Sequence, residues 1–192
     1  MNRAADVAAA GVGLALTSPL LGLAALATKL ESGGPVLYRQ TRVGRHGKDF
    51  EVLKLRSMVV GAEKLGAGYA VDQGDRRITR VGRILRRTSI DELPQLWNIL
   101  RGDMSVIGPR PTLRYQVEQY DEHQRRRLEI RPGLTGWAQV QGRASLPWAD
   151  RIELDVWYVD HRSLRVDLEI LLKTPLALFR GTYRGATGGW RS

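Results

Sequence analysis

The longest hydrophobic stretch of the chain lies near its N-terminus, where residues 7–28 contain no charged side chain. A helix of about 22 residues extends about 33 Å, against roughly 30 Å for the hydrocarbon core of a bilayer. Ser18 and Pro19 stand in the middle of this run. Because proline removes a backbone donor and clashes with the preceding turn, we expect a helix-break-helix there, each arm reaching about half a bilayer deep.

Positive charges flank both ends of this stretch, with Arg3 before it and Lys29, Arg39, Arg42 and Arg45 after it. Because cationic flanks stay on the cytoplasmic side, the pattern favours a re-entrant anchor over residues 1–30 with both ends on that side. Three other interpretations remain open, namely a secretory signal peptide with the cleavage-like triplet Ala25-Leu26-Ala27, a straight membrane-spanning helix, and a buried helix of a soluble protein.

The residues after the anchor alternate between strand-like and helix-like patterns. A β-hairpin is predicted first, with arms over 36–43 and 49–55 around a turn at 44–48. Helical patterns follow over 58–64 and over 78–100, the second with a break near Thr88 and Ser89, and residues 66–74 between them are expected to form a loop.

Glycine and proline divide the second half of the chain. Residues 101–111 and 131–136 are expected to be turns or loops. A short strand is predicted over 137–141, and helices over 113–128, 148–160 and 166–179. The expected fold class is α+β and mainly helical, with a re-entrant anchor over 1–30, one domain over 31–180 that combines the small β-hairpin with amphipathic surface helices, and a flexible tail over 181–192.

Composition limits the chemistry available to this domain. The 192 residues include no cysteine, which excludes disulfides, thiolate metal sites and thiol nucleophiles. The three histidines lack the spacing of paired metal ligands, so any metal should be a hard cation held by carboxylates. The net charge is +10 and 25 of the 30 basic residues are arginine, whose planar fork matches phosphate. We therefore expect a phosphorylated, anionic partner.

The segment 89–96 combines a helix-start signal with two adjacent acids. Ser89 and Glu92 have the spacing of a capping box, and Pro94 is tolerated in a first helical turn. Neighbouring side chains converge at a helix start, and the free amides there stabilise anions. Asp91 is therefore expected to stay ionised as a nucleophile toward phosphorus, and Glu92 is the candidate ligand for Mg²⁺.

Basic residues near this segment are candidate phosphate-binding residues. Arg86 and Arg87 lie one turn before the acids, and Lys54 and Arg56 lie at the end of the second hairpin strand. Arg110 stands between two prolines, which restrict its backbone in advance and suit a preorganised contact to an oxyanion. A surface arginine in a turn remains the alternative interpretation of Arg110.

Five segments form an ordered series of motifs, namely KLRSM at 54–58, TRVGR at 79–83, SIDELPQLWN at 89–98, GDMSVIGPRP at 102–111 and RPGLTGWAQVQGR at 131–143. Together they resemble the bacterial sugar transferase family, the monotopic phosphoglycosyl transferases or polyprenyl-phosphate hexose-1-phosphate transferases. The likeness extends from about residue 18 to residue 174 in family order and spacing, and it is typical of a small member without the N-terminal transmembrane bundle of larger ones.

The resemblance implies a two-step transfer. Asp91 attacks the β-phosphorus of a nucleoside-diphosphate sugar, usually a UDP-sugar, which releases UMP and leaves a sugar-phosphoryl aspartate. A polyprenyl phosphate, commonly undecaprenyl phosphate, then attacks this intermediate and starts the assembly of a cell-surface glycan. Glu92 would bind Mg²⁺, and Ser18 and Pro19 match the break of the re-entrant helix.

The resemblance also marks a set of substrate-binding or phosphate-binding positions, namely Lys54, Arg56, Arg86, Arg87, Arg110, Gln139, Gln141 and Arg143. One departure is visible, since Ala144 stands where the family usually has asparagine. Two interpretations of this departure stay open, an effect on contacts to the nucleotide sugar or no effect.

The implied location is the bacterial inner membrane, with a monotopic anchor and the catalytic domain on the cytoplasmic face. The partners would be a UDP-sugar, a polyprenyl phosphate and membrane phospholipids, with no nucleic acid, and family members of this kind can pair as homodimers. The amphipathic helix over 166–179 suits an interfacial position. Two alternatives stay open, a basic nucleic-acid-binding protein and a membrane-anchored scaffold without catalysis.

Overall fold

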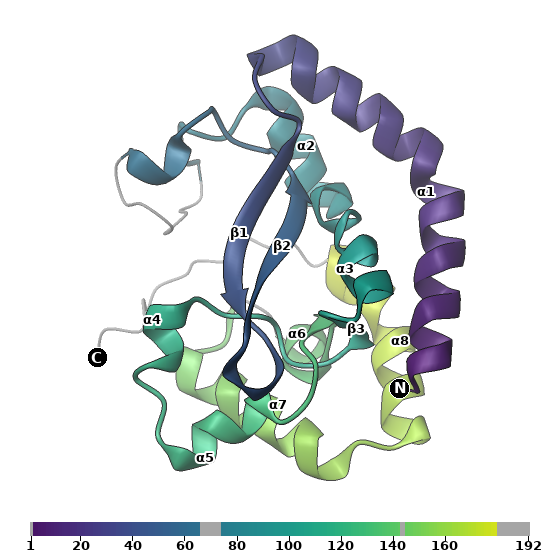
Figure 1. Ribbon diagram of the computed structural model, residues 1–192, viewed down its shortest axis with the longest axis vertical. Helices are drawn as coiled ribbons and strands as arrows, with labels where there is room; N and C mark the ends of the chain where they lie inside the picture. Colours follow the sequence, from purple (N-terminus) through teal and green to yellow (C-terminus); the bar gives the residue numbers. More distant parts are fainter. Residues whose placement is uncertain (1, 66–73, 143–144, 180–192) are drawn as a thin grey trace.

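The computed structural model describes residues 2–65, 74–142 and 145–179. Its elements are α1 (Arg3–Ser32), β1 (Leu37–Val43), the 3₁₀ turn η1 (Arg45–Gly47), β2 (Asp49–Leu55), η2 (Ala62–Lys64), α2 (Arg80–Thr88), η3 (Ile90–Glu92), α3 (Gln95–Arg101), β3 (Ser105–Ile107), α4 (Arg114–Val117), α5 (Glu122–Arg125), η4 (Arg126–Leu128), β4 (Gly133–Thr135), α6 (Trp137–Gln141), α7 (Trp148–His161) and α8 (Leu164–Phe179) (Figure 1). The mainly helical fold class with a small β-hairpin is confirmed. The predicted tail at 181–192 and most of the predicted loop at 66–74 lie outside the described residues.

The N-terminal hydrophobic segment forms one continuous helix, α1, with Pro19 inside it. Pro19 has no N–H for the carbonyl of Ala15, and the hydroxyl of Ser18 donates to that carbonyl at 2.9 Å instead. Figure 1 shows the axis of α1 changing direction along its length. The expected helix-break-helix is therefore a bend within one helix, because a side chain satisfies the acceptor that proline leaves free.

The N-terminal end of α1 is fixed to the body of the protein by polar contacts. Arg3 donates to two carbonyls in the last turn of α3, at 2.5 and 2.8 Å. Asp6 is buried, and its carboxylate accepts from the hydroxyl of Ser105 and from the amide of Val106, each at 2.9 Å. The cationic side chain thus satisfies free carbonyls at a helix C-terminus, and the acid binds the start of β3.

The C-terminal end of α1 is fixed to the same body. The carboxylate of Glu31 accepts from the first two amides of α2, those of Arg80 and Val81, at 2.7 and 2.9 Å. Between its two ends α1 contributes Ala10 and Ala24 to two buried apolar clusters. Its outer face stays exposed and apolar, and α1 is long and hydrophobic enough to cross a membrane, with a mean hydropathy of 1.8 over an 18-residue window. These features are consistent with membrane association.

The predicted hairpin is confirmed, with β1 and β2 antiparallel from Leu37 opposite Leu55 to Val43 opposite Asp49. A side chain joins this hairpin to α3. Asn98 is fully buried, and it accepts from the amide of Leu53 at 3.0 Å and donates to the carbonyl of Glu51 at 2.7 Å. Because Asn98 satisfies backbone groups of β2 as a neighbouring strand would, α3 is held against the hairpin.

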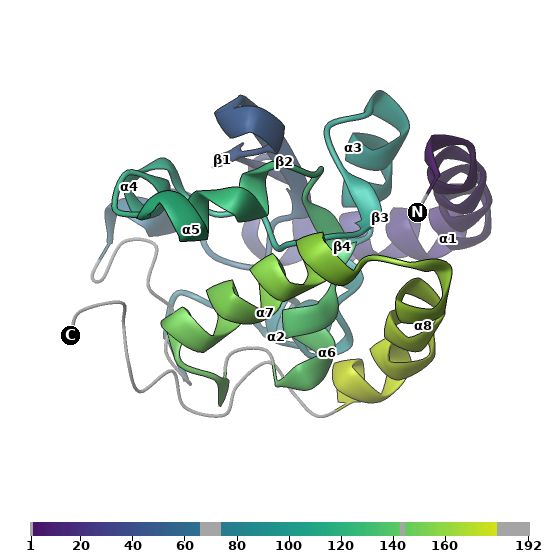
Figure 2. The same ribbon diagram turned by 90° about the horizontal axis from the view of Figure 1, so that it is seen from below.

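A short parallel pair, β3 and β4, lies within two segments predicted to be turns or loops, 101–111 and 131–136, and the residues that flank each strand there remain irregular. Their close approach requires glycine, since a Cβ on Gly133 would lie 2.1 Å from the amide nitrogen of Gly108. Figure 2 shows β3 and β4 between α3 on one side and α6, α7 and α8 on the other. The pair is thus central to the molecule although each strand has only three residues.

Two predicted helices are wrong in part. In the segment 58–64, Met58 pairs with Ile78 in an isolated β-bridge and Gly61 has a φ of 75°, which leaves only the short turn η2. The helix expected over 113–128 divides into α4, α5 and η4. Asp121 starts α5 as an N-cap, accepting from the amide of Gln124 at 2.8 Å, and so interrupts the longer helix.

The strand expected over 137–141 is wrong, because these residues form the helix α6. Helical spacing places Trp137 and Val140 on one face, where both pack against a buried cluster of Ile107, Tyr158 and Ile170. The tertiary contacts of that face stabilise the helix and outweigh the local preference of these residues for a strand. The helices predicted over 148–160 and 166–179 are confirmed as α7 and α8, with α8 starting two residues earlier.

Candidate active site

The two adjacent acids lie in the turn η3 between α2 and α3. The capping box expected at Ser89 is absent. Ser89 has a φ of 58° and closes the end of α2, with its amide donating to the carbonyl of Arg86 at 3.3 Å and without a capping bond from its side chain. A residue in this left-handed conformation cannot serve as an extended N-cap, so Glu92 is free to bind elsewhere.

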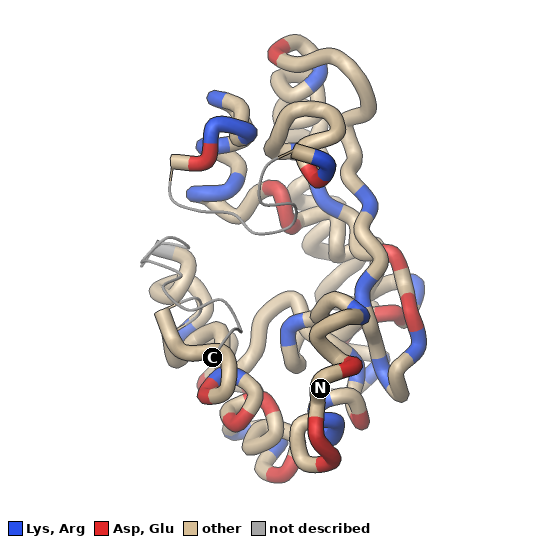
Figure 3. Tube along the Cα trace, turned by 90° about the vertical axis from the view of Figure 1, so that its left-hand side faces the viewer, with Lys and Arg blue, Asp and Glu red and all other residues tan. Residues whose placement is uncertain are grey.

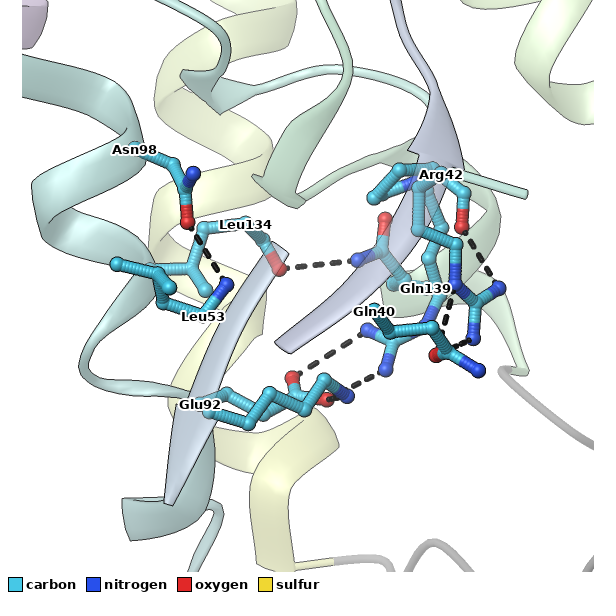
Figure 4. A network of polar contacts seen from close by, with 10 residues as sticks. Gln40, Arg42, Leu53, Glu92, Asn98, Leu134 and Gln139 are labelled. Carbon is cyan, nitrogen blue, oxygen red and sulfur yellow. Dashed lines mark hydrogen bonds and ion pairs between the residues drawn. The ribbon is translucent and has the colours of Figure 1, made fainter. Parts of the chain in front are cut away.

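Glu92 is held by two cations from distant parts of the chain. The ammonium of Lys54, at the end of β2, lies 2.8 Å from Oε1, and the guanidinium of Arg110 binds both carboxylate oxygens (Figure 4). The side chains of Glu92 and Lys54 are about one-fifth exposed, at 18% and 22%. Although burial opposes it, the charges of Arg110 and Lys54 hold the pKa of Glu92 well below its ordinary value. Glu92 is therefore ionised at neutral pH.

Asp91 has the opposite electrostatic environment. Its carboxylate is buried, and burial together with the neighbouring charge of Glu92 raises its pKa to about 6, while Lys54, Arg86 and Arg110 oppose the shift. Within the described part of the chain, neither a hydrogen bond nor an ion pair engages this carboxylate. Asp91 is thus a buried carboxylate that feels three nearby cations but forms no direct hydrogen bond or ion pair with the described residues, which leaves its oxygens available for a nucleophile's role.

The strand β1 adds two polar residues that the sequence did not single out as site residues. Nε of Arg42 donates to Oε1 of Gln40 at 3.0 Å, and Nη1 donates to the carbonyl of Pro111 at 3.3 Å. Burial, followed by repulsion from Arg110, lowers the pKa of Arg42 to about 10. The sequence could have indicated these two residues through the period of two along the strand, which places Gln40 and Arg42 on the same face as Tyr38. Tyr38 pairs with Lys54 on the neighbouring strand, so this face is the one that carries Lys54.

Gln139 presents an unused acceptor. Its Nε2 donates to the carbonyl of Leu134 at 3.0 Å, and its buried Oε1 has no hydrogen-bond partner among the described residues (Figure 4). A buried amide oxygen without a donor is costly. It fits the predicted role of Gln139 in binding a substrate that carries hydrogen-bond donors.

The remaining predicted positions are less closely grouped. Arg86 acts on Asp91 through its charge from the last turn of α2, whereas Arg87 and Gln141 are exposed. The guanidinium of Arg56 is buried and donates to the carbonyl of Gly33 at the end of α1. Arg143 and Ala144 lie outside the described residues. The structure thus brings Lys54, Asp91, Glu92, Arg110 and Arg86 into one electrostatic group, and it turns Arg56 toward the anchor.

The acids fit a magnesium ion only if a substrate supplies further ligands. Among the residues that the structure describes, no three histidine, aspartate or glutamate side chains gather as a metal site. Mg²⁺ is commonly bound through one or two carboxylates, several waters and the phosphates of a substrate. Glu92, whose pKa is held well below its ordinary value, is the carboxylate that fits this minimal set.

Basic side chains are not confined to the site. Figure 3 shows lysine and arginine positions in many parts of the trace, interleaved with acidic ones. At Asp91 and Glu92, positive charge is contributed by residues from β1, β2, α2 and the segment after β3.

Comparison with known proteins places the site in a wider group. The chain is 44% identical to the "Uncharacterized sugar transferase EpsL" of Bacillus subtilis, over 91% of this chain and 85% of that protein. It is 49% identical to the UDP-glucose:undecaprenyl-phosphate glucose-1-phosphate transferase of Caulobacter vibrioides, over 90% of this chain and 67% of that protein.

A third relative is longer. The UDP-N-acetylgalactosamine-undecaprenyl-phosphate N-acetylgalactosaminephosphotransferase of Aeromonas hydrophila is 43% identical over 94% of this chain, which corresponds to 44% of that protein. The family model of the bacterial sugar transferases matches residues 1–181. With nearly its whole length matched, this chain belongs to the bacterial sugar transferase family.

Proposed function

We propose that this protein transfers a sugar-1-phosphate from a UDP-sugar to a polyprenyl phosphate, specifically undecaprenyl phosphate, and releases UMP as the first step of cell-surface glycan assembly. The observation that carries the proposal is the arrangement of a buried Asp91, without a direct hydrogen bond or ion pair among the described residues, beside a Glu92 that Lys54 and Arg110 hold in place. Relatives that share most of this chain are named for the transfer of a sugar phosphate to undecaprenyl phosphate.

In the first step, a carboxylate oxygen of Asp91 forms a bond to the β-phosphorus of the donor. The bond from that phosphorus to the bridging oxygen breaks, and its electron pair leaves with UMP. Negative charge develops on the phosphoryl and bridging oxygens, where Lys54 and Arg110 donate hydrogen bonds. The product on the protein is a sugar-phosphoryl aspartate, an acyl phosphate formed on Asp91.

In the second step, a phosphate oxygen of the polyprenyl phosphate forms a bond to the same phosphorus. The bond to the carboxylate of Asp91 breaks, which restores the aspartate and yields a polyprenyl diphosphate sugar. The same phosphorus atom is attacked in both steps within one active site. The residues that bind its oxygens therefore serve both steps.

Glu92 would hold Mg²⁺ together with the phosphates of the donor. A bound Mg²⁺ neutralises charge on phosphate oxygens. The donor phosphates compete with Glu92 for Arg110 and Lys54, so binding of the diphosphate releases the glutamate to act as a ligand. The proposal therefore expects the metal and the donor to bind cooperatively.

The placement of α1 supports a re-entrant anchor on the cytoplasmic side of the bacterial inner membrane. Arg3 and Glu31 fix the two ends of α1 to one body. A straight crossing would instead place these ends on opposite sides of a hydrocarbon core about 30 Å thick. The outer face of α1 and one face of α8 carry exposed leucines that suit the acyl region and the interface, namely Leu16, Leu23, Leu30, Leu164, Leu168 and Leu172. This monotopic placement puts phospholipids against both helices. The homodimer expected from the resemblance stays a prediction.

Transfer to the lipid tests the proposal. The full chain, in membrane nanodiscs with undecaprenyl phosphate and Mg²⁺, should convert at least one of UDP-glucose, UDP-galactose and UDP-N-acetylgalactosamine into a labelled lipid and UMP. Asp91→Asn should form neither product. Failure of the wild-type chain with the whole panel, or lipid product from Asp91→Asn at the wild-type rate, would contradict the proposal and favour the scaffold alternative.

A further inference from the structure

The peptide that carries Arg110 lacks the usual backbone support. Pro109 and Pro111 flank it, and neither has an N–H that could donate to a neighbouring strand. The carbonyl of Pro109 is held by the amide of Gly133 at 2.9 Å. The carbonyl of Arg110 is held by a side chain, because Nη2 of Arg127 donates to it at 3.0 Å.

Arg127 is itself fixed on several sides within the fold. Its guanidinium forms an ion pair with Asp155 of α7, and both side chains are at least 96% buried. Nη1 lies 2.5 Å from the hydroxyl of Tyr120, and the guanidinium faces the rings of Tyr120 and Trp148 with centroids 5.6 and 5.9 Å away. The orientation of Arg127 is thus set by α7 and by the segment before α5.

A buried ion pair of this kind is weak evidence for stability, because removing two charges from water costs as much as the attraction between them returns. Its geometric effect is clearer. Asp155 orients Arg127, Arg127 holds the carbonyl of Arg110, and the side chain of Arg110 reaches the carboxylate of Glu92.

We infer that Arg127, oriented by Asp155, is a positioning residue for the transfer reaction, which acts by fixing the peptide of Arg110 so that its guanidinium meets the transferring phosphate. The inference rests on the proposed function. Arg127 touches neither Asp91 nor Glu92 in the contacts of the described residues, so its whole effect passes through Arg110.

A double-mutant cycle tests this. Arg127→Lys keeps a positive charge beside Asp155 and loses the fork that also reaches the carbonyl of Arg110. We expect kcat for UMP release to fall about 10- to 100-fold, with KM for the UDP-sugar changed by less than about threefold. In an Arg110→Lys background, the same change should cost less than about twofold, since the residue through which it acts is already altered.

The chain offers a matched control. Arg126 also joins η4 to α7, through an exposed ion pair with Asp160, and has no contact with Arg110. Arg126→Lys should leave kcat within about twofold of wild type. If Arg127→Lys does not fold, which circular dichroism would show, Tyr120→Phe removes one support of Arg127 and replaces it in the cycle.

The outcomes separate the two claims. If the wild-type chain and Arg126→Lys release UMP while Arg127→Lys and Arg110→Lys have multiplicative effects, the positioning role is wrong and the proposed function stands. An Arg127→Lys variant with wild-type kcat would also overturn the inference. A wild-type chain that releases no UMP contradicts the proposed function, and the inference falls with it.

Discussion

The carboxylate of Glu92 forms ion pairs with two cations, Lys54 and Arg110, and so links the charged groups of the site. Lys54 and Arg110 bind it directly, and Arg42 and Arg86 add positive charge beside the acid pair. Four basic groups thus act on two carboxylates. The surplus positive charge favours a diphosphate, and the separate environments of Asp91 and Glu92 fit the roles proposed for them, attack for the first and binding for the second.

Arg110→Lys tests the need for a planar fork at this point. Lysine keeps the charge and loses the two parallel donors that bind both oxygens of Glu92. We expect the rate of UMP release to fall about 100-fold. Arg114→Lys is the matched control, since Arg114 pairs with Asp49 at an exposed position, and it should keep the wild-type rate. Equal rates for the two variants would show that a fork at Arg110 is not required.

The type of chemistry that Asp91 and Glu92 support can be predicted from the sequence, whereas the residues that pair with them are determined by the fold. Adjacent Asp91 and Glu92 with nearby arginines already indicate phosphate chemistry. The pairing of Glu92 with Lys54 joins residues 38 positions apart, which local patterns do not encode. The misassigned capping box has the same origin, because Ser-x-x-Glu spacing says nothing about the positive φ that Ser89 adopts.

Among the elements, the three-residue strands β3 and β4 have a large effect on the site, because their pairing fixes the segment that carries Arg110. The segment that carries Arg110 follows β3 directly, and the approach of β4 depends on the absence of side chains at Gly108 and Gly133. Such three-residue strands in glycine-rich and proline-rich segments resemble turns in the sequence, since strand patterns need longer runs. Long periodic helices such as α7 were predictable for the opposite reason.

Gly133→Ala tests the importance of this pair. A Cβ at Gly133 would lie 2.1 Å from the amide nitrogen of Gly108, so the strands must separate. We expect a destabilisation of roughly 1–3 kcal/mol, measured by chemical unfolding in detergent, together with a loss of UMP release. Gly22→Ala in α1 is the control, because a Cβ there meets nothing within 4 Å. An unchanged Gly133→Ala protein would refute the role given to the strand pair.

For the whole molecule, the decisive feature is the attachment of α1 to one body at both ends. The hydrophobic pattern predicts the helix and its bend. It cannot predict that Asp6 is buried against Ser105, because that contact joins residues 99 positions apart. In the proposed monotopic placement, the bent helix and the exposed leucines of α8 would bring the site to a membrane surface, where a charged donor and a lipid acceptor can meet.

The absence of cysteine makes the topology directly measurable. Ala5→Cys and Pro35→Cys place single thiols at exposed positions near the two ends of α1. In bacterial cells, a membrane-impermeant maleimide added outside should label neither variant, and in inverted vesicles it should label both. Labelling of Ala5→Cys from the periplasmic side would show that α1 spans the membrane and would contradict the re-entrant placement.

The central claim is that Asp91 carries the sugar phosphate between donor and acceptor, and acid-quenched intact-mass analysis of the full chain tests it most directly. With an accepted UDP-sugar and Mg²⁺, but without polyprenyl phosphate, the protein should gain the mass of one sugar-phosphoryl group on the peptide that contains Asp91, with matching release of UMP. Added undecaprenyl phosphate should remove this group, and Asp91→Asn should never acquire it. Formation of the lipid product with no adduct at any quench time, or with an adduct on another residue, would contradict the account.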